Sequence, residues 1–214
     1  MNYILFDGPS RNDLLPLTFT RPVADLRIGI LTIREKWEKM LNTSISTKTE
    51  DYLSIKWPVK LEEKNIFINA SFLPNKDLVE AINALKENQK LVLGEDTLAY
   101  YQYGDSSVDV NQLETLKIDI EVIKVSYTWD IFSKNEEAIT ADFELLTRDR
   151  KSQKIDNSNY VKAAENIFIE EGASVENCSL NASSGPIYIG NNATIMEGSL
   201  IRGPFALCEG ATVK

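Results

Sequence analysis

An aliphatic side chain recurs every six residues near the end of the chain, and this fixed period restricts the fold more than any other feature. The period holds at Ile169 and Val175, and again at Ile189, Ile195, Ile201, Leu207 and Val213. Mostly small residues stand two positions earlier. Such a hexapeptide repeat predicts a solenoid, in which each short strand places one aliphatic side chain inside a narrow prism and small residues let the chain turn. One coil buries little surface, so neighbouring coils must stack.

The alternative is an ordinary sheet of alternating polar and apolar residues, but the regular spacing favours the solenoid. The interval from Val175 to Ile189 exceeds two hexads by two residues, which predicts an insertion that bulges at residues 181–186. The repeat is still running at Val213, where only Lys214 follows, whereas natural solenoids normally end in an atypical cap. We therefore expect the chain to be the front part of a longer protein.

The segment IYIGNNATIMEGSLIRGPFALCEGATVK (residues 187–214) resembles the left-handed parallel β-helix family of acyl- and acetyltransferases. The left hand of the coil is taken from this resemblance. It also implies acetyl transfer from acetyl-CoA by the longer protein, at a site between the subunits of a homotrimer where a catalytic histidine is usual. The chain contains no histidine, so we expect no acetyltransferase activity from these residues alone.

The overall charge and hydropathy limit the partners of the chain. It has 23 Lys and Arg against 32 Asp and Glu, a net charge of −9, whereas nucleic acids and anionic membranes attract basic surfaces. An apolar run long enough for a membrane span and a secretion signal are both missing. We predict no nucleic-acid partner, no membrane partner and a cytoplasmic location. The absence of histidine excludes Ser-His-Asp and Cys-His catalysis within these residues.

A polar stretch without hydrophobic periodicity, RDRKSQKIDNSNY at residues 148–160, is typical of a linker. It divides the chain into an α/β domain at residues 1–150 and a second region at 151–214, which holds the linker and the first coils of the solenoid. Strands alternate with helices in the first domain, which favours a mostly parallel sheet covered on both faces. The strands are expected at residues 3–6, 65–70, 90–94 and 118–123, and the helices at 30–41, 75–85 and 131–146.

Ligands of such sheets bind beyond the carboxyl ends of the strands, so the loop from Asp7 to Leu26 is the first candidate site. Within it, LLPLTFTRPVADLRIGILTI (residues 14–33) resembles the nucleotide loop of sugar-1-phosphate nucleotidyltransferases. Pro16, Leu17 and Thr18 match the Pro-Leu-Thr element of that family. The resemblance implies a Rossmann-like fold and a reaction between a nucleoside triphosphate and a sugar 1-phosphate.

Two arginines carry the catalytic role that the resemblance implies. Arg21 lies near the position of a family lysine that contacts phosphate, and Arg11 is the nearest counterpart of the loop arginine. The reaction brings two anions together, and cations offset their repulsion and the charge that develops in the transition state. A guanidinium can bind phosphate through two hydrogen bonds. The alternative is that both arginines form surface ion pairs, each contributing little to stability.

A further segment, SYTWDIFSKNEEAITADFELLT (residues 126–147), resembles the family element in which an acidic residue before a helix helps to bind magnesium. By this resemblance Asp130 is the expected Mg²⁺ ligand. The alternative is that Asp130 only caps the helix that begins beside it.

The sequence also departs from the family pattern. The stretch from Gly8 to Arg11 reads GPSR and lacks the additional glycines of the nucleotide loop. In INASFLP (residues 68–74), Asn69 and Ala70 stand where the family has a metal-binding Gly-Asp pair. Gly8, Pro16, Leu17, Thr18 and Asn69 therefore remain the expected nucleotide- or substrate-binding residues, with one metal ligand fewer.

The order of the two regions resembles the bifunctional N-acetylglucosamine-1-phosphate uridylyltransferase/glucosamine-1-phosphate acetyltransferase family, and in particular a divergent bacterial branch of it. This implies uridylyl transfer from UTP to N-acetylglucosamine 1-phosphate with Mg²⁺. The alternative is a domain that has lost catalysis and serves an acyltransferase as a sugar-nucleotide binding or regulatory module.

Overall fold

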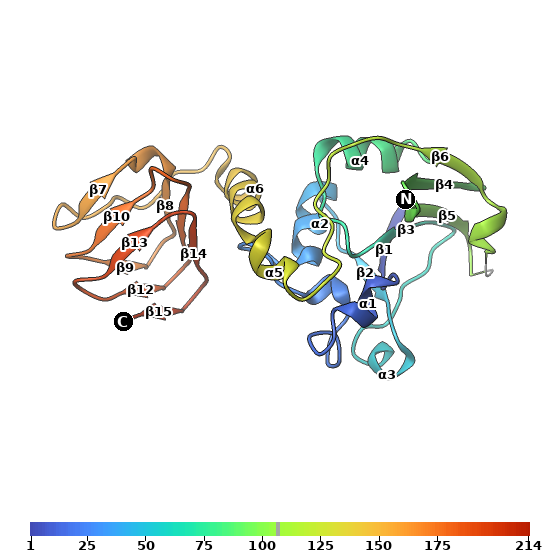
Figure 1. The fold of residues 1–214 in the computed structure, drawn as a ribbon, viewed down its shortest axis with the longest axis horizontal. Helices are drawn as coiled ribbons and strands as arrows, with labels where there is room; N and C mark the ends of the chain where they lie inside the picture. Colours follow the sequence, from blue (N-terminus) through green and yellow to red (C-terminus); the bar gives the residue numbers. More distant parts are fainter. Residues whose placement is uncertain (106–107) are drawn as a thin grey trace. The chain divides into compact units, whose positions relative to one another are not determined.

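The computed structural model describes residues 1–105 and 108–214, which form two compact units (Figure 1). The first unit comprises residues 1–27 and 31–131, and the second comprises residues 28–30 and 132–214. The second unit includes α6 (Asn135–Thr147), because this helix packs its apolar side chains against the strands that follow it, as described below. The domain boundary predicted at residue 150 stays a prediction.

The first unit is built on a mixed sheet of six strands. β1 pairs in parallel with β2 and β3, β4 pairs in parallel with β6, and β5 runs antiparallel to β3 and β4. Consecutive side chains of β1 and β3 are buried, as in strands covered on both faces. The expected α/β class with a mostly parallel sheet is confirmed. In spatial order the strands are β2 (Ser46–Lys48), β1 (Asn2–Phe6), β3 (Lys64–Asn69), β5 (Asp96–Tyr103), β4 (Gln89–Leu93) and β6 (Glu114–Lys117).

Two longer helices of the first unit begin where capping residues stand in the sequence. At α2 (Ile33–Leu41), Thr32 accepts from the Glu35 N–H while the Glu35 carboxylate accepts from the Thr32 N–H, a capping box. At α4 (Lys76–Asn83), Asn75 accepts from the third helical N–H. Both helices agree with the hydrophobic pattern. The short helices of this unit are α1 (Ser10–Asp13), η1 (Val23–Asp25), α3 (Asp51–Ser54) and η2 (Val110–Gln112).

The strand expected at residues 118–123 is absent, and β6 ends before it at Lys117. The chain there is irregular and only half-buried. It then meets the chain after β3, where Ile123 O accepts from the Leu73 N–H at 2.9 Å and the Val125 N–H donates to Ser71 O at 2.7 Å. This short antiparallel contact uses too few backbone groups for a full strand.

In the second unit, the strands that the structure describes form three parallel sheets of three strands each. The aliphatic residues of the six-residue period line the core, with Ile189 0 % exposed. The phase shifts before the insertion: Leu180, rather than Asn181, aligns with Ile201. The three sheets consist of β7 (Tyr160–Lys162), β10 (Ser179–Asn181) and β13 (Leu200–Arg202); β8 (Ile167–Ile169), β11 (Ile187–Ile189) and β14 (Phe205–Leu207); and β9 (Ser174–Val175), β12 (Thr194–Ile195) and β15 (Thr212–Val213).

One sheet of the second unit is covered by α6. Ile139 of α6 clusters with Phe168 of β8 and Tyr188 of β11, together with Ile30. The expected single helix from residue 131 is divided into α5 (Asp130–Ser133) and α6, with Lys134 outside helical geometry at φ −103° and ψ 6°. A short η3 (Ala164–Asn166) precedes β8. Among the helices of the described ranges, none has both the length and the apolar character that a membrane span requires.

The predicted linker is bound to the second unit along part of its length. The Arg150 guanidinium makes two hydrogen bonds to the Glu170 carboxylate, at 2.9 and 2.6 Å, and the Tyr188 hydroxyl donates to the same carboxylate at 2.7 Å. The Gln153 N–H donates to Ile169 O at 2.7 Å. Burial and the neighbouring Glu170 carboxylate raise the pKa of Tyr188 above its ordinary value, so the phenol remains a proton donor.

Candidate functional site

The carboxyl ends of β1, β2 and β3 meet at one edge of the first unit's sheet because these strands are parallel. The chain continues the pairing just past the strands: the Asp7 N–H donates to Lys48 O at 3.1 Å, and the Ala70 N–H donates to Phe6 O at 3.0 Å. This is the edge at which open α/β sheets bind ligands. The candidate loop, residues 7–26, begins here.

Gly8 and Asn69 touch at this edge. A Cβ atom on Gly8 would lie 2.7 Å from both Oδ1 and Nδ2 of Asn69, so no larger residue fits without a shift. Asn69 is 2 % exposed; its Nδ2 donates to Thr97 O at 3.2 Å and its Oδ1 accepts from the Ser71 N–H at 3.0 Å. The structure thus brings together two residues that the sequence nominated separately for substrate binding.

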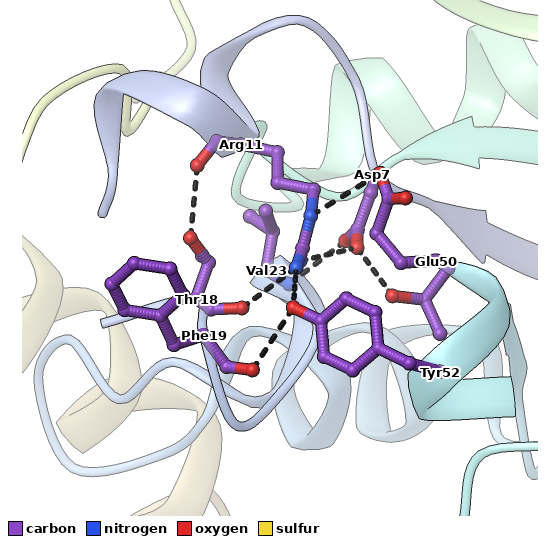
Figure 2. A network of polar contacts seen from close by, with 8 residues as sticks. Asp7, Arg11, Thr18, Phe19, Val23, Glu50 and Tyr52 are labelled. Carbon is purple, nitrogen blue, oxygen red and sulfur yellow. Dashed lines mark hydrogen bonds and ion pairs between the residues drawn. The ribbon is translucent and has the colours of Figure 1, made fainter. Parts of the chain in front are cut away.

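Asp7 joins three segments of the first unit (Figure 2). Its carboxylate accepts from the Val23 N–H at 2.8 Å, the Thr49 hydroxyl at 2.6 Å and the Arg11 guanidinium at 3.0 Å. Burial raises the pKa of Asp7, and these three donors oppose that rise. Sequence reasoning did not nominate Asp7, although its position directly after a buried strand was a usable signal.

Arg11 is buried inside the loop rather than extended towards solvent (Figure 2). Besides Asp7, its guanidinium donates to Thr18 O and to the Tyr52 hydroxyl, both at 2.7 Å, and Nε lies 3.5 Å from a Glu50 oxygen. The buried Thr18 hydroxyl donates in return to Arg11 O at 2.9 Å. These bonds between Arg11 and Thr18 stabilise the fold of the loop. The expected role of Arg11 in catalysis and that of Thr18 in substrate binding stay predictions.

The middle of the loop faces solvent. Pro16 and Leu17 are exposed, whereas the neighbouring Thr18 is fully buried, so the Pro-Leu-Thr element is divided between surface and interior. Arg21 is exposed and makes no hydrogen bond or ion pair with another residue in the described ranges. Its guanidinium is therefore open to an anion from solvent, and its expected contact with phosphate stays a prediction.

Asp130 ends a turn that leads from the irregular segment into α5. Its Oδ2 accepts from the backbone N–H groups of Ser126 and Tyr127 at 2.7 and 2.9 Å, which closes the turn that precedes α5. The expected role of Asp130 as a magnesium ligand stays a prediction. Since Val125 pairs antiparallel with Ser71, the chain after Val125 runs back towards the end of β3. Within residues 1–105 and 108–214, no three Asp, Glu, Cys or His side chains gather as a ready metal site.

The chain was compared with known proteins and protein families. None of the curated proteins matches the chain. The family model described as "Sugar nucleotidyl transferase" matches residues 3–151, a range that contains all of the six-stranded sheet except Asn2, together with the candidate loop and Asp130. The match covers more than half of the chain, so the protein belongs to the sugar nucleotidyl transferase family.

Proposed function

We propose that the first unit transfers a uridylyl group from UTP to N-acetylglucosamine 1-phosphate. The observation that carries the proposal is the family match over residues 3–151 together with the contact of Gly8 and Asn69 at the carboxyl edge of the sheet. A sugar phosphate oxygen attacks the α-phosphorus of UTP. The bond from that phosphorus to the β-phosphate oxygen breaks, and pyrophosphate leaves with the electron pair.

Negative charge develops on the phosphates during this transfer, and we assign the exposed guanidinium of Arg21 to bind it. A guanidinium forms two parallel hydrogen bonds to phosphate, and it stays charged throughout the physiological pH range. Arg11 instead fixes the path of the loop that carries Arg21, through Asp7, Thr18 and Tyr52. In this proposal Arg11 therefore supports catalysis by positioning the loop that carries Arg21, and not by contact with the substrate.

Magnesium is part of the proposal, with Asp130 as the protein ligand. Mg²⁺ in nucleotide sites is usually held by one or two carboxylates plus substrate phosphates. A single carboxylate is therefore compatible with it, and the part of the chain that the structure describes holds no cluster of three ligands. When bound, the ion would screen the phosphates from each other. Because Asn69 stands where the family pattern has an aspartate, the proposal has one carboxylate ligand fewer.

The test is pyrophosphate release from UTP and N-acetylglucosamine 1-phosphate with Mg²⁺. We expect turnover that EDTA abolishes and that falls by about a hundredfold or more in Asp130→Ala. Parallel reactions with dTTP, GTP, glucose 1-phosphate and mannose 1-phosphate assign the substrates. Release of pyrophosphate with another pair only would retain the reaction class and reject UTP and N-acetylglucosamine 1-phosphate.

A second candidate is a binding module without catalysis. It is favoured by Asn69, whose amide is tied to Thr97 and Ser71, and by Arg11, whose guanidinium is tied to protein groups. Calorimetry with UDP-N-acetylglucosamine separates the two: the module predicts binding without Mg²⁺ and no turnover with it.

For the second unit we propose the start of a left-handed β-helix that belongs to an acyl- or acetyltransferase in a longer protein. The proposal is supported by the three parallel sheets and the six-residue period of their core. It carries with it acetyl-CoA as cosubstrate, a homotrimer and a cytoplasmic location for that longer protein. Sedimentation of the longer protein as a monomer would reject the trimer.

A further inference from the structure

Lys48 is the last residue of β2 and lies at the carboxyl edge of the first unit's sheet. Phe6 of β1 pairs with Lys48 on one side and with Asn69 of β3 on the other, so the three residues form a row across three strands. Directly paired side chains of a parallel sheet point to the same face. Lys48 therefore shares a face with Asn69, whose side chain lies against Gly8.

The ammonium group of Lys48 lies over an aromatic ring on that face. Its Nζ atom is 5.6 Å from the centroid of Phe67, which shares the face of Asn69 because it comes two residues earlier in β3. Phe67 is buried and stacks on Tyr100, with ring centroids 4.9 Å apart. A cation is attracted to the face of an aromatic ring, so this fixed ring holds the long lysine side chain near Asn69.

Carboxylates in the chain around Lys48 are bound to Arg11. The Asp7 N–H donates to Lys48 O at 3.1 Å, but the Asp7 carboxylate binds Arg11 at 3.0 Å. Glu50, two residues after Lys48, lies 3.5 Å from Arg11 Nε. The Lys48 side chain is exposed and makes no hydrogen bond or ion pair with another residue of 1–105 and 108–214. An ammonium group is thus open to an anion at the edge where α/β sheets bind ligands.

An exposed lysine on β2 also has an ordinary explanation. β2 is an edge strand of the sheet, and edge strands often carry lysine, which discourages pairing with another chain. That role requires a charge in solvent, but neither the contact with Phe67 nor a place in the row with Asn69. The contact and the place favour a site for an anion.

We propose that Lys48 binds a phosphate group of the substrate at the carboxyl edge, on the face that it shares with Asn69. The proposal rests on the proposed function for the identity of the ligand, which is a diphosphate or triphosphate group. Inorganic pyrophosphate, a product of the proposed reaction, is its simplest form. An ammonium group makes charge-assisted hydrogen bonds to phosphate oxygens. Since Arg11 is bound to protein groups, Lys48 supplies a cation in addition to Arg21.

Calorimetry of the whole chain with inorganic pyrophosphate and Mg²⁺ tests the proposal. Lys48→Met keeps an unbranched side chain beside Phe67 but removes the charge, and it should weaken binding about tenfold or more. Lys48→Arg keeps a positive charge and should retain most of the affinity. Lys64→Met is the matched control, because Lys64 is also exposed but stands at the opposite, amino end of β3. This control has the same net charge as Lys48→Met and should bind as the wild type does.

Equal affinities of Lys48→Met and Lys64→Met would overturn the proposal, as would a wild-type chain that does not bind pyrophosphate. Acetylation of the wild type by acetic anhydride gives a second readout that needs no variant. Saturating pyrophosphate should slow acetylation of Lys48 about tenfold and leave Lys64 unchanged. Should Lys48→Met fail to fold, this measurement decides the question, and equal acetylation of Lys48 with and without pyrophosphate would overturn the proposal.

Turnover separates this proposal from the proposed function. With UTP and N-acetylglucosamine 1-phosphate, Lys48→Met should lower kcat/KM about tenfold, and Lys64→Met should not change it. A wild-type chain that binds pyrophosphate through Lys48 without turnover would reject the proposed function and retain the phosphate site. Turnover that Lys48→Met leaves unchanged would retain the proposed function and overturn the role of Lys48.

Discussion

The two units stabilise their turns in opposite ways. In the candidate loop, one buried guanidinium binds Asp7, Thr18, Tyr52 and Glu50, so several turns depend on a single side chain. In the second unit, the same few backbone pairings repeat between neighbouring strands of each sheet, and every strand adds a few apolar side chains to the core. A change in the candidate loop should therefore disturb the whole loop, whereas a change in one strand of the second unit should disturb mainly the neighbouring strands.

The largest effect is expected from Arg11→Ala. It leaves the buried Asp7 carboxylate without its ion-pair partner and the Thr18 carbonyl without a donor, and breaking a buried pair usually costs about 3–5 kcal/mol. Urea unfolding of the first unit measures the loss. Arg21→Ala, at an exposed position of the same loop, is the control and should stay within about 0.5 kcal/mol. Equal losses of stability in both variants would contradict the claim that several turns of the loop depend on Arg11.

Gly8→Ala is expected to have the next largest effect. The new Cβ would lie 2.7 Å from the Asn69 amide, and relief of such a clash costs about 1–3 kcal/mol. Because the contact lies at the candidate site, nucleotide binding should weaken together with stability. Gly94→Ala also replaces a glycine of this unit, at φ +59° but with no atom within 4 Å, and should leave binding unchanged. Full nucleotide binding by Gly8→Ala would show that the contact is unrelated to the site.

In the second unit, Ile195→Val should cost only about 0.5–1.5 kcal/mol, the usual range for removal of one buried methylene. The effect should remain in the neighbouring strands, which hydrogen exchange of β9, β12 and β15 can resolve. Loss of protection throughout the second unit would show that its strands are as cooperative as the candidate loop.

The smallest effect concerns pH. Burial raises the folded-state pKa of Asp7 above its ordinary value, so the folded chain holds that proton more tightly than the unfolded chain. The contribution to stability is complete below the unfolded-state pKa, about 3.9 for Asp, and is lost as pH rises through the folded-state pKa. Relative to Asp7→Asn, the wild type should thus lose stability as pH rises from about 3.9, measured as urea midpoints. A relative gain over that range would contradict the direction of the shift.

The difference between the units also explains what the sequence could predict. The six-residue period is a local signal, so the buried positions of Ile189 and Ile195 follow from spacing alone. The spacing shortens before the insertion, between Val175 and Leu180, so the place of Leu180 in the core does not follow from the six-residue period. The assignment of α6 to the second unit depends on Phe168 and Tyr188, which lie beyond a polar linker, and no helical pattern encodes that choice.

The loop resists prediction for a related reason. A basic residue that binds phosphate and one that binds its own protein look the same in a sequence, because the partners of Arg11 include Glu50 and Tyr52, far along the chain. Gly8 and Asn69 were nominated from separate motifs, and only the parallel pairing of β1 with β3 shows that they touch. The hydrogen bonds that Asp130 accepts from Ser126 and Tyr127 depend likewise on the turn before α5, which the sequence pattern did not predict.

We propose, as the central point, that buried Arg11 stabilises the fold of the candidate loop and that exposed Arg21 binds the reacting phosphate. It is tested most directly by the rate of pyrophosphate release from UTP and N-acetylglucosamine 1-phosphate, comparing Arg21→Ala with Arg27→Ala. Both arginines are exposed, but Arg27 already lies 3.6 Å from Glu35. We predict that Arg21→Ala alone reduces kcat/KM, by about a hundredfold, with unfolding midpoints unchanged. Equal activity in the two variants would contradict the claim.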